Sequence, residues 1–274
     1  MSSAAQAIGV FDSGVGGLTV LRALAQALPQ ESWIYLGDTA RLPYGTKSAA
    51  TVQRYALRAA EALVARGIKA LVVACNTASA AALPALRERF AGLPVIGVVE
   101  PGAAAAVAAS PSGRIAVIAT ESTVAGGAYE RAILALQPAA QVRSLACQLF
   151  VALAEEGWTD GEVPLAAAHR YLDALFALPA GRPDVLLLGC THFPVLAPVL
   201  AQVVGEGVQV VDASRSVAHA LAQVLAERQL LARQGDPVTP PCLLATDGVA
   251  RFARVGATFL GHDLAPQQVQ LVDL

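Results

Sequence analysis

The sequence predicts an α/β fold in which two similar lobes each hold a mainly parallel sheet flanked by helices. Short aliphatic runs alternate with helix-length segments along the chain, as in strands joined by crossover helices. A strand-like run that ends in a cysteine and polar residues occurs twice, at Cys75 and Cys190, which are 190 − 75 = 115 positions apart. Segments 8–17 and 115–127 extend this repeat more loosely. We therefore expect one α/β unit used twice, related by pseudo-two-fold symmetry around a cleft.

The first series of elements begins with a short apolar strand and a glycine-rich turn. Pro29 and Gly67 mark the ends of its first two helices, since proline stops a helix and glycine commonly follows one. The predicted strands are 8–11, 33–36, 70–74 and 95–98, and the predicted helices are about 18–28, about 48–65, and one from Thr77 to about Phe90.

A second series begins near Gly102 and repeats the alternation. In parallel sheets ligands bind beyond the C-terminal ends of the strands, which is where both cysteine motifs lie. The predicted strands are 115–119, 142–145, 185–188, 208–211 and 243–245, and the predicted helices are about 127–136, 150–156, 164–178, 214–228 and 249–255.

Composition indicates a folded globular protein and argues against nucleic-acid binding and against a membrane-spanning segment. The chain has 274 residues, of which 55% are hydrophobic and only 15% charged. Its net charge of −2 and the lack of a Lys/Arg run argue against nucleic acid as the primary partner. Its apolar runs are too short for the ~20-residue span that a bilayer requires. Segment 1–7 carries no positively charged side chain and does not resemble a secretory signal, so we expect a cytoplasmic protein.

Two of the four cysteines stand in matched contexts. Cys75 and Cys190 each follow an apolar strand and precede polar residues, whereas Cys147 and Cys242 lack such neighbours and are interpreted as structural. A lone cysteine at a strand end is usually a small core residue, but a matched pair favours a functional role. No C-x-x-C spacing occurs, so zinc and thioredoxin-like sites lack their usual sequence support.

Two opposed thiols suit one kind of chemistry. Inverting a carbon stereocentre requires that a proton leave from one face and that another arrive on the opposite face. A thiol with a reference pKa of about 8.5 is accessible in both protonation states near neutral pH. A helix beginning after Cys75 favours anions, including a thiolate and a substrate carboxylate. His192 can supply charge or a proton to Cys190, and Asp12 can orient a substrate ammonium or influence Cys75.

The loop after the first strand is not a nucleotide-binding fingerprint. Its sequence D-S-G-V-G-G places glycines at 14, 16 and 17, which do not match G-x-G-x-x-G. By itself the loop is consistent with a tight strand-to-helix turn, or with close backbone approach to a small ligand. A lone histidine is usually structural too, and only His192 stands beside a candidate thiol.

Five ordered segments, spread over nearly the whole chain, form a distinctive set. They are I-G-V-F-D-S-G-V-G-G-L-T-V, Y-L-G-D-T-A-R-L-P-Y-G-T-K-S, V-V-A-C-N-T-A-S-A, P-V-I-G-V-V-E-P-G and L-L-G-C-T-H-F-P-V-L. Together they resemble the glutamate racemases of the aspartate/glutamate racemase superfamily. The cysteine pair alone supports the superfamily, and the D-S-G-V-G-G and P-Y-G-T-K-S loops point to the glutamate branch.

The resemblance implies roles for particular residues. Cys75 and Cys190 would be the catalytic acid/base pair, assisted by Asp12, His192 and Glu155. Gln148 and Ala152 stand where the family commonly has proline, which leaves open whether the assisting carboxylate is Glu155 or Glu156. The implied substrate contacts are Asp12, Ser13, Tyr44, Gly45, Asn76, Thr77, Thr191 and His192.

The resemblance also implies an organisation and a biological setting. One lobe would comprise residues 1–98 and 212–274 and carry Cys75, and the other residues 99–211 with Cys190. The active site would lie in the cleft between them. No cofactor and no metal is implied, the substrate is glutamate, and the product D-glutamate would serve peptidoglycan synthesis. Homodimers are common in the family. Some family members carry an N-terminal extension through which a cell-wall precursor activates them. Only seven residues precede Ile8 here, so we expect no such activation.

Three alternatives remain at this point. The first is another racemase of the superfamily, acting on aspartate or a hydantoin. The second is a two-lobed amino-acid binding protein without catalysis. The third is a redox-active pair, in which Cys75 and Cys190 form a disulfide.

Overall fold

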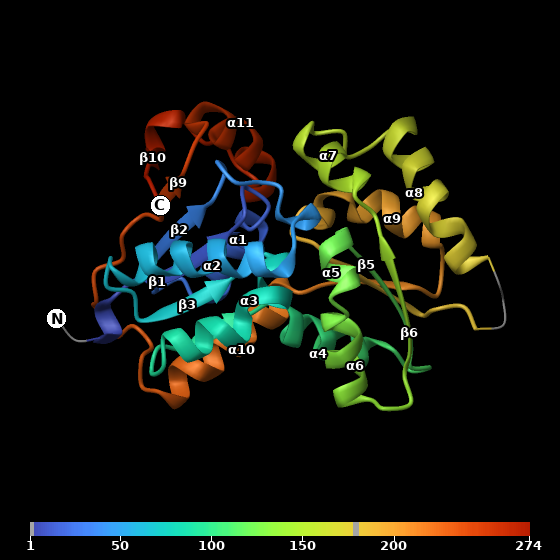
Figure 1. Cartoon of the computed structure of the whole chain (residues 1–274), viewed down its shortest axis with the longest axis horizontal. Helices are drawn as coiled ribbons and strands as arrows, with labels where there is room; N and C mark the ends of the chain where they lie inside the picture. The colour runs from blue at the N-terminus through green and yellow to red at the C-terminus, as the bar shows by residue number, and fades with distance from the viewer. Residues whose placement is uncertain (1–2, 178–180) are drawn as a thin grey trace.

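Two separate parallel sheets form the frame of the molecule, one in each half of Figure 1. The computed structural model describes residues 3–177 and 181–274. The larger sheet has the strand order β10-β9-β2-β1-β3-β4, and the smaller has the order β6-β5-β7-β8. The larger sheet consists of β1 (Ile8–Asp12), β2 (Trp33–Gly37), β3 (Ala70–Val73), β4 (Val95–Gly97), β9 (Cys242–Ala245) and β10 (Val269–Leu271). The smaller consists of β5 (Arg114–Ala119), β6 (Gln141–Ala146), β7 (Val185–Gly189) and β8 (Gln209–Asp212).

The two sheets share one topology. The order β2-β1-β3-β4 in the larger sheet matches β6-β5-β7-β8 in the smaller, and the strand pairs are parallel. Strand β3, which precedes Cys75, therefore occupies the position of β7, which precedes Cys190. This confirms the predicted fold class of two similar α/β lobes. Strands β9 and β10 extend the larger sheet beyond the repeat.

Helices cover both faces of each sheet because the central strands are apolar on both sides. In β1, Ile8 and Val10 pack into one cluster with α1, α10 and α11, whereas Phe11 packs on the other face with α2 and α3. These helices are α1 (Leu18–Ala27), α2 (Ala49–Val64), α3 (Asn76–Arg89), α10 (Ser214–Glu227) and α11 (Val249–Leu260). Alternating side chains on a pleated strand produce this division.

The smaller sheet is covered in the same way. Helices α7, α8 and α9 enclose one apolar cluster, and α4 and α6 enclose the other. The helices are α4 (Val99–Ala109), α5 (Glu121–Ala125), α6 (Ala128–Leu136), α7 (Leu149–Glu155), α8 (Glu162–Phe176) and α9 (Ala197–Val204). Four 3-10 turns complete the described elements: η1 (Ser3–Ala5), η2 (Tyr44–Thr46), η3 (Phe193–Leu196) and η4 (Pro266–Gln268).

Most predicted elements are present with ends shifted by one or two residues, and the larger differences have local causes. Helix α4 was not predicted. Its Pro101 lies in the first helical turn, where the backbone N–H that proline lacks has no partner within the helix. Helix α11 runs five residues further than predicted and ends at Gly261, whose φ is +80°. The elements α5, α9 and β10 also escaped prediction. The predicted helix end at Leu178 lies outside the described residues.

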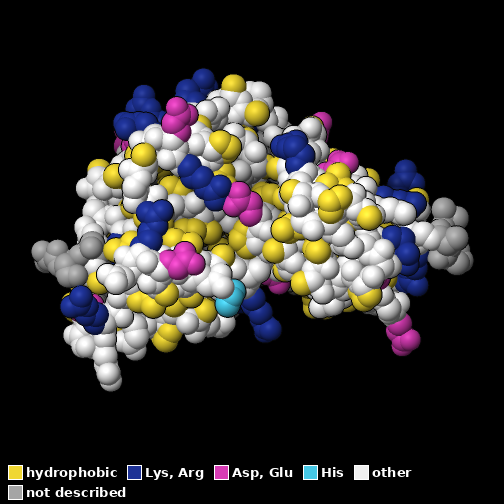
Figure 2. Space-filling view, turned by 90° about the horizontal axis from the view of Figure 1, so that it is seen from below, with side chains coloured by type: hydrophobic (Ala, Val, Ile, Leu, Met, Phe, Trp, Pro, Cys, Tyr) yellow, Lys and Arg dark blue, Asp and Glu magenta, His cyan; other side chains and the backbone are white. Residues whose placement is uncertain are grey.

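The surface carries scattered charges of both signs. On the face shown in Figure 2, Lys and Arg side chains lie interspersed with Asp and Glu, and no single basic patch dominates. Among the described residues, no helix combines the length and apolar character needed to cross a bilayer.

Candidate active site

Both candidate thiols line one small cavity between the lobes. One residue separates the end of β3 from Cys75, and Cys190 directly follows β7. The C-terminal ends of equivalent strands therefore position the two thiols. The cavity has a volume of about 30 Å³ and is lined from both lobes. Eight of the other predicted site residues line it as well: Ser13, Tyr44, Gly45, Asn76, Thr77, Glu155, Thr191 and His192.

Cys75 is a buried thiol at the start of α3. Its Sγ accepts a hydrogen bond from Ala78 N at 3.4 Å and lies 3.5 Å from Ser13 Oγ. Burial raises the pKa of Cys75 to about 12, the negative charges of Asp12 and Cys190 add to this, and the contacts of Ser13 and Ala78 oppose it. Sequence reasoning expected the helix terminus to favour the thiolate, but burial outweighs that effect. Because a charge on Cys190 disfavours a second charge on Cys75, the site favours one thiolate at a time.

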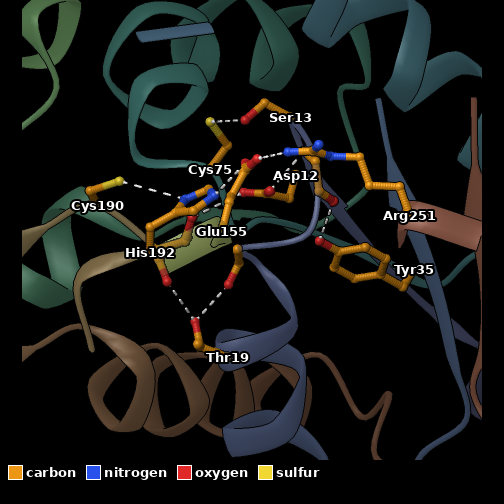
Figure 3. Close-up of polar contacts among 12 residues, drawn as sticks. Asp12, Ser13, Thr19, Tyr35, Cys75, Glu155, Cys190, His192 and Arg251 are labelled. Atoms are coloured by element: carbon orange, nitrogen blue, oxygen red, sulfur yellow. Dashed lines mark hydrogen bonds and ion pairs between the residues drawn. The ribbon is translucent and has the colours of Figure 1, made fainter. Parts of the chain in front are cut away.

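Cys190 stands at the inner end of a chain of charged groups (Figure 3). His192 Nδ1 lies 3.9 Å from Cys190 Sγ, and His192 Nε2 lies 3.1 Å from Glu155 Oε1. Burial acts to lower the pKa of His192, but its hydrogen bonds to Cys190 and Glu155, with the charges of Cys190 and Asp12, raise that pKa to about 10. His192 is therefore an imidazolium at neutral pH, placed to stabilise a thiolate on Cys190.

The last member of that chain is an arginine. Arg251 Nη2 lies 2.9 Å from Glu155 Oε2. The hydrogen bond with His192 contributes most to lowering the pKa of Glu155, and Arg251 lowers it further against the opposing effect of burial. Glu155 is thus ionised at neutral pH. The next residue, Glu156, is exposed and caps α7, so the structure places Glu155 and not Glu156 beside His192.

Asp12 lies behind the cavity wall, fully buried at the end of β1. Its Oδ2 accepts a hydrogen bond from Gly14 N at 2.9 Å, and its Oδ1 accepts one from Thr191 Oγ1 at 3.5 Å. Burial raises the pKa of Asp12, and the positive charge of His192 is the main opposing influence. The negative charge of Asp12 in turn raises the pKa values of Cys75 and His192.

Polar contacts join the lobes around the cavity. The hydroxyl of Thr77, at the start of α3, lies 2.9 Å from that of Thr120 and 3.1 Å from that of Thr123, both in the other lobe. The amide oxygen of Asn76 accepts a hydrogen bond from Tyr129 OH at 2.5 Å. These contacts hold the N-terminus of α3 against the second lobe.

The hydroxyl of Tyr44 is directed elsewhere. It donates a 2.6 Å hydrogen bond to Asp38 Oδ2, and Asp38 also binds Arg41 at 2.9 Å. Tyr44 lines the cavity nonetheless, next to Gly45. A Cβ on Gly45 would lie 2.6 Å from Thr120 Cβ, so glycine allows this segment to approach the opposite lobe.

Thr120, Tyr129 and Arg251 each contact a predicted site residue but were not themselves predicted. Thr120 follows β5, the strand equivalent to β1, so the repeat itself was a signal that Thr120 occupies the position of Ser13. Tyr129 and Arg251 lie on helices whose sequences carry no mark of function. The two cysteines interpreted as structural lie outside the cavity, and all four are free, which disagrees with a disulfide between Cys75 and Cys190.

Gly16 leaves the space that the His192 side chain occupies, so a larger residue at position 16 is expected to lower the activity. A Cβ at this position would lie 2.5 Å from both His192 Nδ1 and Thr191 Oγ1. We expect Gly16→Ala to displace the imidazole and to lower kcat/KM by about 10²-fold, the usual effect of a 1 Å misplacement. Gly126→Ala is the matched control, because its Cβ would meet nothing closer than 3.3 Å. Equal activity of the two variants would contradict the proposed role of His192.

Comparison with known proteins agrees with this geometry. The profile of the Asp/Glu/Hydantoin racemase family matches residues 8–221. A glutamate racemase of Geobacter metallireducens is 51% identical over 94% of each chain. The chain belongs to the glutamate racemase branch of that family. Of the solved structures, this racemase is similar to a Bacillus anthracis glutamate racemase, with a TM-score of 0.91, 37% identity and 98% of each chain covered.

Two further solved structures resemble this chain to different degrees. A Francisella tularensis glutamate racemase in complex with D-glutamate has a TM-score of 0.89 to this racemase, with 35% identity and 98% of each chain covered. A Picrophilus torridus aspartate racemase has a TM-score of 0.54 and only 16% identity, covering 82% of this chain and 97% of that one, so this likeness shows the fold alone.

Proposed function

We propose that this racemase interconverts L-glutamate and D-glutamate by proton transfer at Cα between Cys75 and Cys190. The observation that carries the proposal is that equivalent strands of the two lobes deliver the two thiols into one cavity. The similarity to glutamate racemases, one of them in complex with D-glutamate, supports glutamate as the substrate.

Each turnover moves one proton on each face of the substrate. A thiolate on one cysteine removes the Cα proton, so that a C–H bond breaks and an S–H bond forms. The electron pair left on Cα is delocalised into the substrate carboxylate. The thiol of the other cysteine then protonates Cα from the opposite side and becomes the thiolate. The product leaves the two protonation states exchanged, and binding of the opposite enantiomer restores them.

Neighbouring groups adapt the two thiols differently. Burial and the charge of Asp12 make a thiolate on Cys75 strongly basic, which suits the removal of a weakly acidic Cα proton. On the other side the His192 imidazolium, held by Glu155, stabilises a thiolate on Cys190. We assign Asp12, His192 and Glu155 as the groups that assist the cysteines.

The remaining predicted residues are proposed to hold the substrate. The N-terminus of α3 lies at the cavity, where Asn76 and Thr77 line the wall, and the partial positive charge of a helix N-terminus suits the binding of a carboxylate. On the same grounds of lining the cavity, we assign substrate contacts to Ser13, Tyr44, Gly45, Thr191 and His192, with Asp12 acting through its charge.

The setting of the reaction is also a proposal. We infer a cytoplasmic enzyme that supplies D-glutamate for peptidoglycan and uses no cofactor. The proposed lobe boundary at 98/99 is supported by the packing of Val98 in the core of the larger sheet and of Val99 in that of the smaller. The proposed boundary at 211/212 falls one residue before the end of β8, because Asp212 still pairs with Leu188 in the smaller sheet, whereas Ala213 packs in the core of the larger. A homodimer stays a prediction, which light scattering in solution would test.

The proposed function is tested by following both enantiomers in deuterated water. We expect Cα deuterium to appear in the product from either enantiomer of glutamate. Aspartate, one methylene shorter, should react with a kcat/KM lower by about 10- to 200-fold. A preference for aspartate or a hydantoin would place the activity in another branch of the superfamily. Binding of glutamate without isotope exchange would identify a non-catalytic binding protein.

A further inference from the structure

An ion pair crosses between the lobes beside the catalytic cavity. Arg251 lies in the first turn of α11, which packs on the larger sheet, and Glu155 is the last residue of α7, which packs on the smaller. The two helices face each other across the lobe boundary in Figure 1, and Figure 3 draws the ion pair between their side chains. Arg251 Nη2 lies 2.9 Å from Glu155 Oε2. This contact depends on the two lobes being close together.

Each carboxylate oxygen of Glu155 contacts a different partner. Oε1 contacts His192 and Oε2 contacts Arg251, so rotation of the carboxylate is restricted at both ends. The resulting chain leads from Arg251, whose side chain is 55% exposed, to Cys190, which is 6% exposed.

Helix α11 contacts the same histidine at a second point. The Phe259 ring packs edge-on against the His192 imidazole, with ring centroids 5.2 Å apart. Arg251 and Phe259 lie eight residues apart, about two helical turns, and so occupy one face of α11. Helix α11 of the first lobe therefore makes two contacts with this site of the second lobe. Phe259 packs against His192, and Arg251 orients Glu155, the carboxylate that contacts His192.

Arg251 does not line the catalytic cavity. It lines an adjoining cavity of about 120 Å³, together with Asp247, Leu42 and Glu155. The charged or titratable groups facing His192 are Asp12 from β1, Cys190 after β7 and Glu155 from α7. Arg251 from α11, with Asp247 beside the same outer cavity, faces Glu155. Arg251 is thus placed to act on His192 through Glu155 and not through the substrate.

We propose that Arg251 is a positioning residue: from the opposite lobe it holds Glu155 against His192, so that the charged chain to Cys190 is complete only when the lobes are closed. The proposal rests on the proposed racemase mechanism and adds a residue to it. Lysine at the same position retains a positive charge and reaches Glu155 with a single ammonium, so it should preserve most of the effect.

The test compares Arg251→Met and Arg251→Lys with Arg89→Met. Arg89 is the control because its side chain is exposed to a similar degree, 60% against 55% for Arg251, and it forms an ion pair with Glu61, at 3.2 Å, outside the catalytic cavity. Steady-state kinetics from pH 6.5 to 10 are measured for each protein. We expect Arg251→Met to lower kcat/KM about fivefold, the upper end for a partly exposed ion pair. Arg251→Lys should recover most of the loss, and Arg89→Met should match the parent.

The pH profile separates positioning from a merely structural role. Contact with Glu155 raises the pKa of His192, so a loosened carboxylate lets the imidazolium lose its proton at lower pH. The alkaline limb of kcat/KM should therefore move to lower pH by about half a unit in Arg251→Met and stay in place in Arg251→Lys. A lower rate with an unmoved limb would overturn the proposal, as would equal effects of Arg251→Met and Arg89→Met.

A readout that needs no turnover distinguishes this inference from the proposed function. The rate of alkylation of each cysteine at pH 7.5 is measured by peptide mass spectrometry. In Arg251→Met the rate for Cys190 should fall by about threefold, because the imidazolium that stabilises its reactive thiolate is held less firmly beside it. The rate for Cys75 should not change. If the parent protein fails to racemise glutamate while Cys190 still reacts more slowly in Arg251→Met, the proposed function is wrong and the positioning role stands. An unchanged rate for Cys190 overturns the role of Arg251.

Discussion

Replacing Cys75 or Cys190 by serine is expected to lower kcat/KM for glutamate racemisation by about 10²- to 10⁴-fold, the contribution of a positioned acid or base. A serine hydroxyl is a much weaker acid than a thiol, so it is not available as a base near neutral pH. The loss should be equal for L- and D-glutamate, because the enantiomers have equal free energies in water and the ratio of the two kcat/KM values cannot change. Polarimetry of both reactions measures it.

A substrate that reacts after one proton transfer separates the two thiols. With β-chloroglutamate, removal of the Cα proton by a thiolate is followed by loss of chloride, which leaves with the C–Cl electron pair and gives an enamine. We expect each serine variant to retain this elimination with only one enantiomer, and the two variants to prefer opposite enantiomers. Cys242→Ser, a half-buried cysteine outside the cavity, is the control and should keep both activities. A racemisation rate near that of the parent in either single variant would exclude that cysteine as an essential base.

Replacing Lys69 by methionine is expected to destabilise the fold by about 3–5 kcal/mol, the usual effect of breaking a buried ion pair. Lys69 Nζ lies 2.5 Å from Glu31 Oε2, and the two side chains are 0% and 2% exposed. Lys69 also donates to Ala4 O at 2.5 Å, and Glu31 accepts a hydrogen bond from Ala232 N at 2.9 Å. The pair thus connects β3 to the N-terminal segment and to the loop after α10, and its loss leaves a buried carboxylate without its counter-charge.

Urea unfolding of three variants tests this effect. Lys69→Met combined with Glu31→Leu should recover much of the lost free energy of unfolding, because no buried charge is then unpaired. Arg89→Met, which breaks an exposed pair, should cost less than about 1 kcal/mol. Lys69 precedes β3, at the end of the strand opposite Cys75, so kcat/KM of the folded variant should not change. A cost below about 1 kcal/mol for Lys69→Met would show that the pair is not a determinant of stability.

Local patterns predicted most of the elements and both thiols. Aliphatic runs such as 70–74 and 185–188 are readable as strands because each is buried on both faces, and the cysteines follow them at fixed spacing. The repeat of the two lobes was also visible in the sequence, because the equivalent strands before Cys75 and Cys190 end in similar residues. The sequence could not decide whether Glu155 or Glu156 contacts His192, because adjacent residues at the end of a helix differ only in the direction of their side chains.

The sequence by itself determined the α/β class, the two-lobed repeat and the residues that bring thiols to strand ends, because these depend on neighbours in the chain. Only the tertiary structure decided that β9 and β10 extend the larger sheet, that Thr77 meets Thr120 across the cleft, and that Arg251 reaches Glu155 from 96 positions away. An arginine on the polar face of an amphipathic helix has the same local pattern whether it faces water or a carboxylate. Its partner is selected by how the helices pack, and that is a property of the whole chain.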